Sequence, residues 1–168
     1  MQILLLLVFL VFAILFMLTQ QRTLDAIQLE NRTTSPGSVW MQLIPIFGFV
    51  WQFIVIIRIA DSIRNEITAR QDDSILGVAD AAAVSQLNKR PTMIIGLSYC
   101  ILTSLSILLS VLMGIIMSAN NNTDDIQPAT TEIFGLLVSL FMLASIICWI
   151  IYWVQMSIWK RKILKIRI

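Results

Sequence analysis

The few side chains that could perform acid–base chemistry lie close together in the sequence. Asp61, Glu66, Asp72 and Asp73 could act as proton donors or acceptors, but the chain contains no histidine to work with them. Without histidine, His-ligated haem and His-based zinc sites are excluded. Asp72 and Asp73, followed by Ser74, are better explained as the start of a helix than as a cation site. The sequence therefore predicts no catalytic residue, no metal and no cofactor, and the chain is not expected to be an enzyme.

The two thiols are the remaining reactive groups. Cys100 and Cys148 both fall inside long apolar stretches, where a thiol commonly serves as a small apolar side chain. No glycine-rich phosphate loop and no nucleophile elbow occurs in the sequence. These features favour packing and binding over catalysis.

Four long apolar runs must position these groups. Their central stretches contain no charged residue, and only 13% of the chain is charged, against about 25% in soluble domains. A helix of about twenty apolar residues matches the ~30 Å hydrocarbon core of a bilayer. The sequence thus predicts an all-α fold, an integral membrane four-helix bundle forming a single membrane domain over residues 1–168. The expected transmembrane helices are at about 2–18, 39–59, 92–118 and 132–159.

The distribution of Lys and Arg predicts the orientation, because these residues concentrate in cytoplasmic segments. Of the 12, five lie between the second and third runs and five follow the fourth, which leaves only Arg22 and Arg32 in the first loop. Both termini are therefore predicted to be cytoplasmic, with the second and fourth helices extending into the cytoplasm. The expected loops are a cytoplasmic loop at 60–91 and outer loops at 19–38 and 119–131.

The cytoplasmic side carries two further predicted surface elements. An amphipathic helix at about 74–88 would lie under the bundle, on the membrane surface or on a partner. The basic tail at 160–168 alternates basic and apolar residues, which suits anionic headgroups or a docking partner. Its cationic residues are Lys160, Arg161, Lys162, Lys165 and Arg167.

A row of small residues marks the third run as a helix-packing surface. Ser106, Ser110, Gly114 and Ser118 recur every four residues and share one face of a helix. Small residues let helix backbones approach closely, and their hydroxyls can bond across the contact. We expect this row to pack against the chain's other helices, with self-association as the alternative.

The second and fourth runs carry further packing signals. Trp149 and Trp153 lie deep in the fourth run, at a depth similar to that of Trp51, and are expected to pack against the second helix or a partner. Pro45 and Gly48 interrupt the second run, which predicts a kink or local unwinding there.

The segment Asn31–Glu66 resembles part of a widespread group of uncharacterised bacterial multi-helix membrane proteins. In that group an Arg-Thr-x-x-Pro-Gly turn leads into Val-Trp-x-x-x-Ile-Pro, then Val-Trp-x-Phe and an Ala-Asp-Ser end. The matching residues are Arg32, Thr33, Pro36, Gly37, Val39, Trp40, Ile44, Pro45, Val50, Trp51, Phe53, Ala60, Asp61 and Ser62. The stretch 147–154 is similar to the group's last helix. The resemblance implies a multi-pass protein of the bacterial inner membrane and implies no activity.

The sequence has many residues suited to helix packing and few reactive groups. It therefore predicts a non-catalytic membrane protein that serves as an accessory, assembly or stabilising subunit of a larger membrane complex. The alternatives are a homo-oligomeric channel or small-solute transporter lined by the hydroxyl face of the third helix, and a lipid-binding membrane protein. Expected partners are membrane lipid and other membrane subunits or a second copy of the chain. A net charge of +2 is too small to indicate nucleic acid as a partner.

Overall fold

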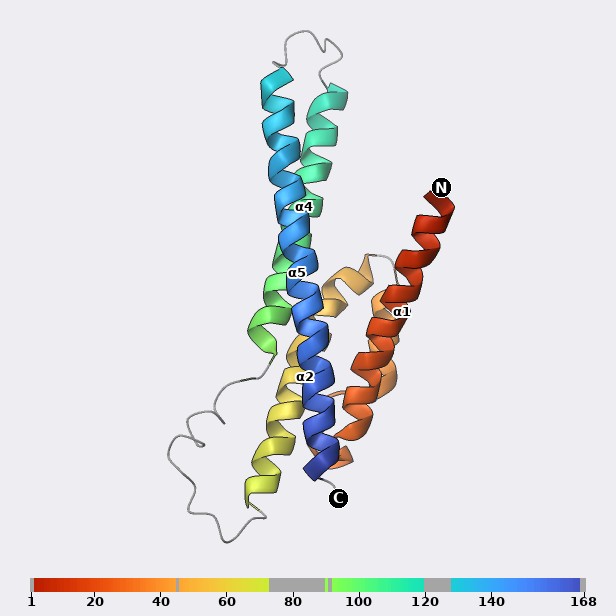
Figure 1. The fold of residues 1–168 in the computed structure, drawn as a ribbon, viewed down its shortest axis with the longest axis vertical. Helices are drawn as coiled ribbons and strands as arrows, with labels where there is room; N and C mark the ends of the chain where they lie inside the picture. Colours follow the sequence, from red (N-terminus) through yellow and green to blue (C-terminus); the bar gives the residue numbers. More distant parts are fainter. Residues whose placement is uncertain (1, 45, 73–89, 91, 120–127, 167–168) are drawn as a thin grey trace. The chain divides into compact units, whose positions relative to one another are not determined.

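The computed structural model describes residues 2–44, 46–72, 90, 92–119 and 128–166. Over these residues the chain forms helices and no strand, which confirms the predicted all-α fold (Figure 1). The α-helices are α1 (Gln2–Ala26), α2 (Phe47–Asp72), α4 (Met93–Ala119) and α5 (Pro128–Ile166), and two short 3-10 helices are η1 (Leu29–Asn31) and η2 (Pro36–Leu43).

The chain divides into two compact units. The first comprises Met1–Ile94 together with Tyr152–Ile168, and the second comprises Ile95–Ile151. The long helix α5 contributes to both. The second unit is therefore an antiparallel pair formed by most of α4 and the first part of α5, which lie side by side (Figure 1).

Among the described residues, two helices are long and apolar enough to cross a membrane, Met93–Ser118 and Glu132–Leu164. At 1.5 Å per residue the shorter of them extends about 38 Å, more than the ~30 Å of a hydrocarbon core. Only 11% and 6% of their most apolar windows are buried within the chain. The pair is joined by a hydrogen bond between the Thr103 and Ser145 hydroxyls. Most of its apolar side chains therefore face outward.

In the first unit, the core forms where α1, η2, α2 and the last part of α5 meet. Leu24, Val39, Ile59, Ile63 and Tyr152 are fully buried there, one or more from each of these four helices. Burial of apolar surface stabilises the fold by about 25 cal/mol for each Å² removed from solvent. The first half of α1, in contrast, exposes a run of Ile, Leu, Val and Phe side chains.

The second apolar run is a hairpin, so the prediction of one helix at 39–59 is wrong. The helix η2 ends at Leu43, the chain reverses, and α2 begins at Phe47. The indole N–H of Trp51 donates to the Ser38 carbonyl at 2.7 Å, which fastens the two arms together. Where a kink or local unwinding was predicted, the chain changes direction completely. We call residues 36–58 the η2–α2 hairpin.

Gly48 and Ile46 form the turn of this hairpin, and Pro45 lies outside the described residues. The Gly48 N–H donates to the Ile44 carbonyl at 2.6 Å. A Cβ on Gly48 would overlap the carbonyl oxygen of Gln42 and would lie 2.7 Å from the carbonyl carbon. Ile46 adopts a φ of 65°, a left-handed conformation that is an outlier for a β-branched residue. The close approach of the two arms therefore requires glycine at position 48.

Two loops that were predicted on opposite sides of a membrane are hydrogen-bonded to each other. Loop 19–38 was expected outside and loop 60–91 inside, separated by ~30 Å of hydrocarbon. In the structure the Gln28 N–H donates to the Glu66 carboxylate at 3.0 Å, and the Thr33 N–H donates to the Ser62 hydroxyl at 2.9 Å. These two segments are therefore in direct contact, and the side of a membrane on which each lies stays a prediction.

The directions of α1 and α5 also bear on the predicted topology. Trp153 packs against Phe12, and ten residues further along α1 the Arg22 side chain lines a cleft together with Lys160 and Arg161. The two helices therefore run in the same direction within this unit. If both cross a bilayer, the two termini cannot share one side, in conflict with the prediction that both are cytoplasmic.

The other predicted boundaries differ less. The helix α4 coincides with the predicted 92–118 within one residue at each end, and α5 is longer than 132–159 at both ends. The second and fourth helices continue past the expected spans, to Asp72 and Ile166. The predicted amphipathic helix at 74–88 lies outside the described residues.

Candidate functional site

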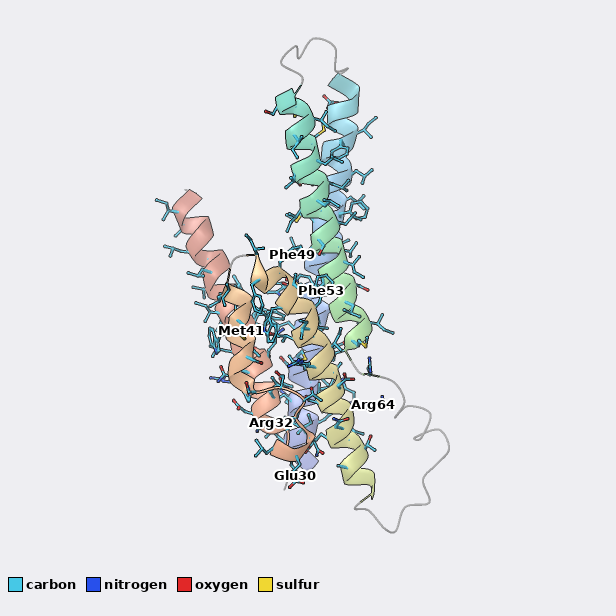
Figure 2. All side chains as sticks on the ribbon, turned by 180° about the vertical axis from the view of Figure 1, so that it is seen from behind. Glu30, Arg32, Met41, Phe49, Phe53 and Arg64 are labelled. Carbon is cyan, nitrogen blue, oxygen red and sulfur yellow. The ribbon has the colours of Figure 1, made fainter. Side chains whose placement is uncertain are left out.

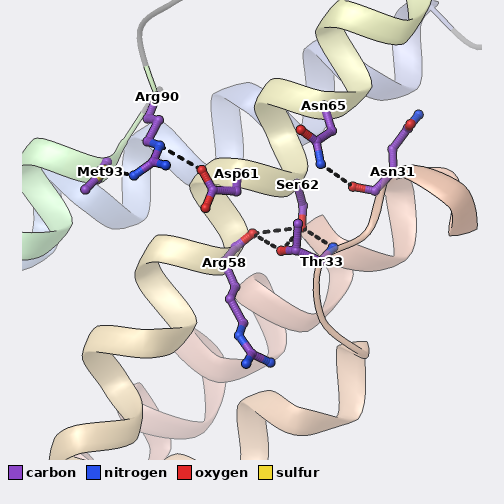
Figure 3. Close-up of polar contacts among 8 residues, drawn as sticks. All are labelled: Asn31, Thr33, Arg58, Asp61, Ser62, Asn65, Arg90 and Met93. Atoms are coloured by element: carbon purple, nitrogen blue, oxygen red, sulfur yellow. Dashed lines mark hydrogen bonds and ion pairs between the residues drawn. The ribbon is translucent and has the colours of Figure 1, made fainter.

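A cluster of hydroxyl groups holds the loop before η2 against α2 (Figure 3). The Thr33 hydroxyl donates to the Arg58 carbonyl at 2.7 Å and lies 2.9 Å from the Ser62 hydroxyl. Ser62, which is fully buried, donates to the same Arg58 carbonyl at 2.8 Å. Because the Thr33 N–H also donates to Ser62, this contact anchors the start of the hairpin to the middle of α2.

Glu66, one turn further along α2, ties down the end of α1. One carboxylate oxygen accepts from the Gln28 N–H at 3.0 Å and from the Asn31 side-chain amide at 2.7 Å. Asn65 supports the contact by donating to the Asn31 carbonyl at 3.4 Å (Figure 3). Glu66 is fully buried, and a buried carboxylate requires such donors. Its role here is to hold the segment after α1, which does not fit an exposed catalytic acid or base.

Of the remaining acidic candidates, the structure describes the side chain of Asp61. Asp61 pairs with the guanidinium of Arg90 at 2.8 Å (Figure 3). The side chain of Asp72, and Asp73 altogether, lie outside the described part of the chain. Among the residues that the structure describes, no group of three His, Cys, Asp or Glu side chains could hold a metal ion.

Side-chain amides and indoles dock the η2–α2 hairpin on α1. The Trp40 N–H donates to the Gln21 side chain at 2.7 Å, and the Gln42 amide donates to the Gln20 side chain at 2.8 Å. Trp51 stacks on Phe47 with ring centres 5.3 Å apart. Trp51, predicted to pack at a helix interface or on a partner, joins η2 and α2 within the hairpin through its bond to Ser38.

The tip of the hairpin is apolar and open. Ile46 is 90% exposed, and Phe47, Phe49 and Val50 are also exposed. Figure 2 shows Met41 and Phe49 towards the tip, at the opposite end of this unit from Glu30 and Arg32. The hairpin therefore has an apolar tip and a polar base.

The small-residue row of α4 is open over most of its length. Ser106 is buried, and its carbonyl accepts from the Ser110 hydroxyl at 2.8 Å. Ser110, Gly114 and Ser118 are exposed, and a Cβ placed on Gly114 would meet nothing within 4 Å. Within the described residues, a Cβ at Gly114 would therefore touch no neighbouring helix, and the packing partner of the row stays a prediction.

The deep tryptophans of α5 have different surroundings. Trp153 donates its N–H to the Thr19 hydroxyl at 2.9 Å and meets Phe12 and Phe16 edge-on. It thus packs on α1, a contact that was not predicted. Trp149 is half-buried in the second unit.

The predicted basic tail is the end of α5 and splits into two groups. Lys160 and Arg161 line a cleft with Arg22, and Lys162 lies over the Trp159 ring at 4.7 Å. The Lys165 side chain and Arg167 are not among the described parts of the structure.

Several residues in these contacts were not singled out as site residues from the sequence. They are Gln20, Gln21, Gln28 and Asn31, whose hydrogen-bond partners lie far along the chain, and Arg22, which lines a cleft with residues of α5. Thr33, Trp51 and Ser62 lie in the segment Asn31–Glu66. The resemblance of that segment to other membrane proteins was the sequence signal that pointed to them. Comparisons with protein-family models, with curated proteins and with solved structures returned no match for this chain, so the resemblance remains a prediction.

Proposed function

We propose that the chain is a non-catalytic integral membrane protein that assembles with, and stabilises, other membrane helices. Two long apolar helices that bury little of their surface within the chain support a membrane location. The resemblance of Asn31–Glu66 to bacterial membrane proteins supports the inner membrane as that location.

The contacts in the first unit support three crossings and a re-entrant hairpin in place of four crossings. In this arrangement α1, α4 and α5 span the bilayer, whereas the η2–α2 hairpin enters and leaves on one side. From Phe47 to Arg58 the helix rises about 17 Å, roughly half of the ~30 Å hydrocarbon core. From Gln2 to Thr19, α1 rises about 26 Å, close to that thickness.

This topology gives a simpler charge distribution than the one predicted from the sequence. By their positions along the chain, all 12 Lys and Arg residues fall on one side, whereas the four-crossing topology left Arg22 and Arg32 on the other. Lys and Arg concentrate in cytoplasmic segments. The start of α1 is then outside, and the end of α5 is cytoplasmic.

Cysteine labelling separates the two topologies. In a variant with both native cysteines replaced, Ser35→Cys should react with a membrane-impermeant maleimide only after the cytoplasmic side is opened. Asn122→Cys, between α4 and α5, should react from outside and serves as the control. Labelling of Ser35→Cys from outside in intact cells would restore the four-crossing topology.

The single observation that carries the assembly role is the open small-residue face of α4. Exposed Ser110, Gly114 and Ser118 leave room for a second helix backbone, and in lipid such rows associate by close packing. The tryptophans of the hairpin and Trp153, in contrast, already have partners within the chain. The face of α4 is therefore where another membrane helix, of a partner or a second copy, would bind.

A bulky side chain at Gly114 tests this role. Gly114→Leu meets no atom of its own chain within 4 Å of the new Cβ, so the variant should fold and lose its stoichiometric partners on purification in mild detergent. Leu112→Phe lies about 200° around the helix and should retain them. Equal partner recovery from both variants, or a monomer from the parent at every detergent strength, contradicts the proposal.

A homo-oligomeric channel is the second candidate, because Ser110 and Ser118 present hydroxyls on the same open face. Liposomes containing only this chain would then show solute flux. Ser110→Leu should abolish that flux, while Leu112→Phe should leave it unchanged. Absence of flux from the parent chain excludes this candidate.

A further inference from the structure

A cleft between α1 and the end of α5 combines three cations with an apolar wall. Its volume is about 280 Å³, and Arg22, Lys160 and Arg161 line it together with the hydroxyl-bearing Thr19 and Ser157. We propose that this cleft binds the phosphate group of an anionic phospholipid. A volume of this size has room for several water-sized groups at ~30 Å³ each, and hence for a phosphate and part of its glycerol.

The charges of the cleft are unbalanced within the described part of the chain. Arg22, Lys160 and Arg161 have no hydrogen-bond or ion-pair partner there, and no carboxylate lines the cleft. Two other cations are placed differently, since Arg90 pairs with Asp61 and Lys162 lies over Trp159. Like charges brought together repel each other. An anion between the three side chains would relieve that repulsion.

The apolar wall selects a lipid over a free phosphate ion. Leu15, Leu18 and Trp153 line the same cleft as the cations, so one cavity offers both an apolar and a charged surface. In the proposed topology, the three cations lie at the cytoplasmic interface, where anionic headgroups are found. The site therefore rests on the membrane location proposed above, but it does not depend on the assembly role.

Binding of short-chain lipids to the full chain in uncharged detergent tests the site. We expect dihexanoyl phosphatidylglycerol to bind in calorimetric titrations. Dihexanoyl phosphatidylcholine, whose headgroup has no net charge, should bind at least fivefold more weakly, about the effect of one lost charge contact. Inorganic phosphate, which has no acyl chains to contact the apolar wall, should also bind more weakly. Arg22→Gln and Lys160→Gln should each weaken phosphatidylglycerol binding about fivefold, because one cation near a headgroup corresponds to roughly that factor. Arg22→Lys should retain most of the affinity.

Lys162→Gln is the matched control, because it removes the same charge from the same turn of α5 but not from the cleft. Its affinity should stay close to that of the parent chain. An equal loss in Lys162→Gln would show that the tail attracts lipid by charge alone and would overturn the site. Equally tight binding of phosphatidylcholine, or of inorganic phosphate, would overturn the assignment to an anionic lipid. Unchanged thermal unfolding of the Gln variants shows that binding and not folding was altered.

Discussion

Replacing Glu66 by alanine should release the segment after α1 from α2. The carboxylate is fully buried, and one of its oxygens accepts the Gln28 N–H at 3.0 Å and the Asn31 amide at 2.7 Å. These bonds join positions 38 and 35 residues apart in the sequence. They therefore fasten the end of α1 to α2, and their loss should affect the whole first unit.

The expected magnitude follows from the two hydrogen bonds. A bond to a charged acceptor contributes about 1.5–3 kcal/mol, so the pair corresponds to roughly 3–6 kcal/mol. Alanine leaves both N–H groups without this acceptor. We expect the free energy of unfolding of Glu66→Ala to fall by an amount in this range, which is large for a single substitution.

Two measurements check this prediction. Unfolding of the purified chain in mixed micelles, followed by tryptophan fluorescence, gives the change in free energy. Amide hydrogen exchange over 27–31 reports on the local contact, and exchange there should accelerate more than exchange in α4.

Glu66→Gln is the matched control, since its amide oxygen can still accept both hydrogen bonds. Bonds between neutral groups contribute about 0.5–1.5 kcal/mol each, so this variant should lose roughly half as much stability as alanine. If alanine lowers the free energy of unfolding by less than about 0.5 kcal/mol, the ordinary range for surface substitutions, the contact does not hold the fold. Unchanged exchange over 27–31 would refute the reasoning independently.

Three further substitutions test the hairpin and its neighbours. Gly48→Ala forces a Cβ against the Gln42 carbonyl and should destabilise the chain by about 1–3 kcal/mol in the same unfolding assay; an unchanged midpoint would mean that the two arms are not this close. Ile46→Gly removes the strain of a φ of 65° at an exposed position and should raise the free energy of unfolding by about 1 kcal/mol. A lower unfolding midpoint would contradict a left-handed conformation at this position. Trp153→Phe loses the 2.9 Å hydrogen bond to Thr19 but keeps an aromatic ring, and should reduce stability by about 1 kcal/mol; a loss of several kcal/mol would indicate that ring size matters more than the N–H.

The helices of the second unit were predictable because their signals are local. The third apolar run has no internal Pro or charged residue, and α4 follows it within one residue at each end. Its small-residue row was found by spacing alone. The spacing did not predict which helix packs against this row. A four-residue period does not show whether another helix of the same chain lies next to Gly114.

The hairpin was not predictable for a physical reason. A re-entrant hairpin and a crossing helix have the same apolar composition, so hydropathy cannot separate them. Pro45 and Gly48 marked a break, but the reversal depends on contacts between distant positions, such as Trp51 with Ser38 and Gln42 with Gln20. Counting that run as a crossing is also what placed Arg22 on the opposite side from the other basic segments in the predicted topology.

The polar side chains of the hairpin explain how non-helical backbone could lie within a bilayer. Backbone groups in hydrocarbon must find partners inside the protein, and the end of a helix leaves its last carbonyls unpaired. Here the Trp51 indole bonds the Ser38 carbonyl, the Gln42 amide bonds the Val39 carbonyl, and the Gly48 N–H bonds the Ile44 carbonyl. These groups satisfy backbone and are therefore occupied, which makes them poor ligands for a transported solute. The open face of α4 and the cationic cleft, in contrast, are the surfaces that we propose for a partner helix and for a lipid.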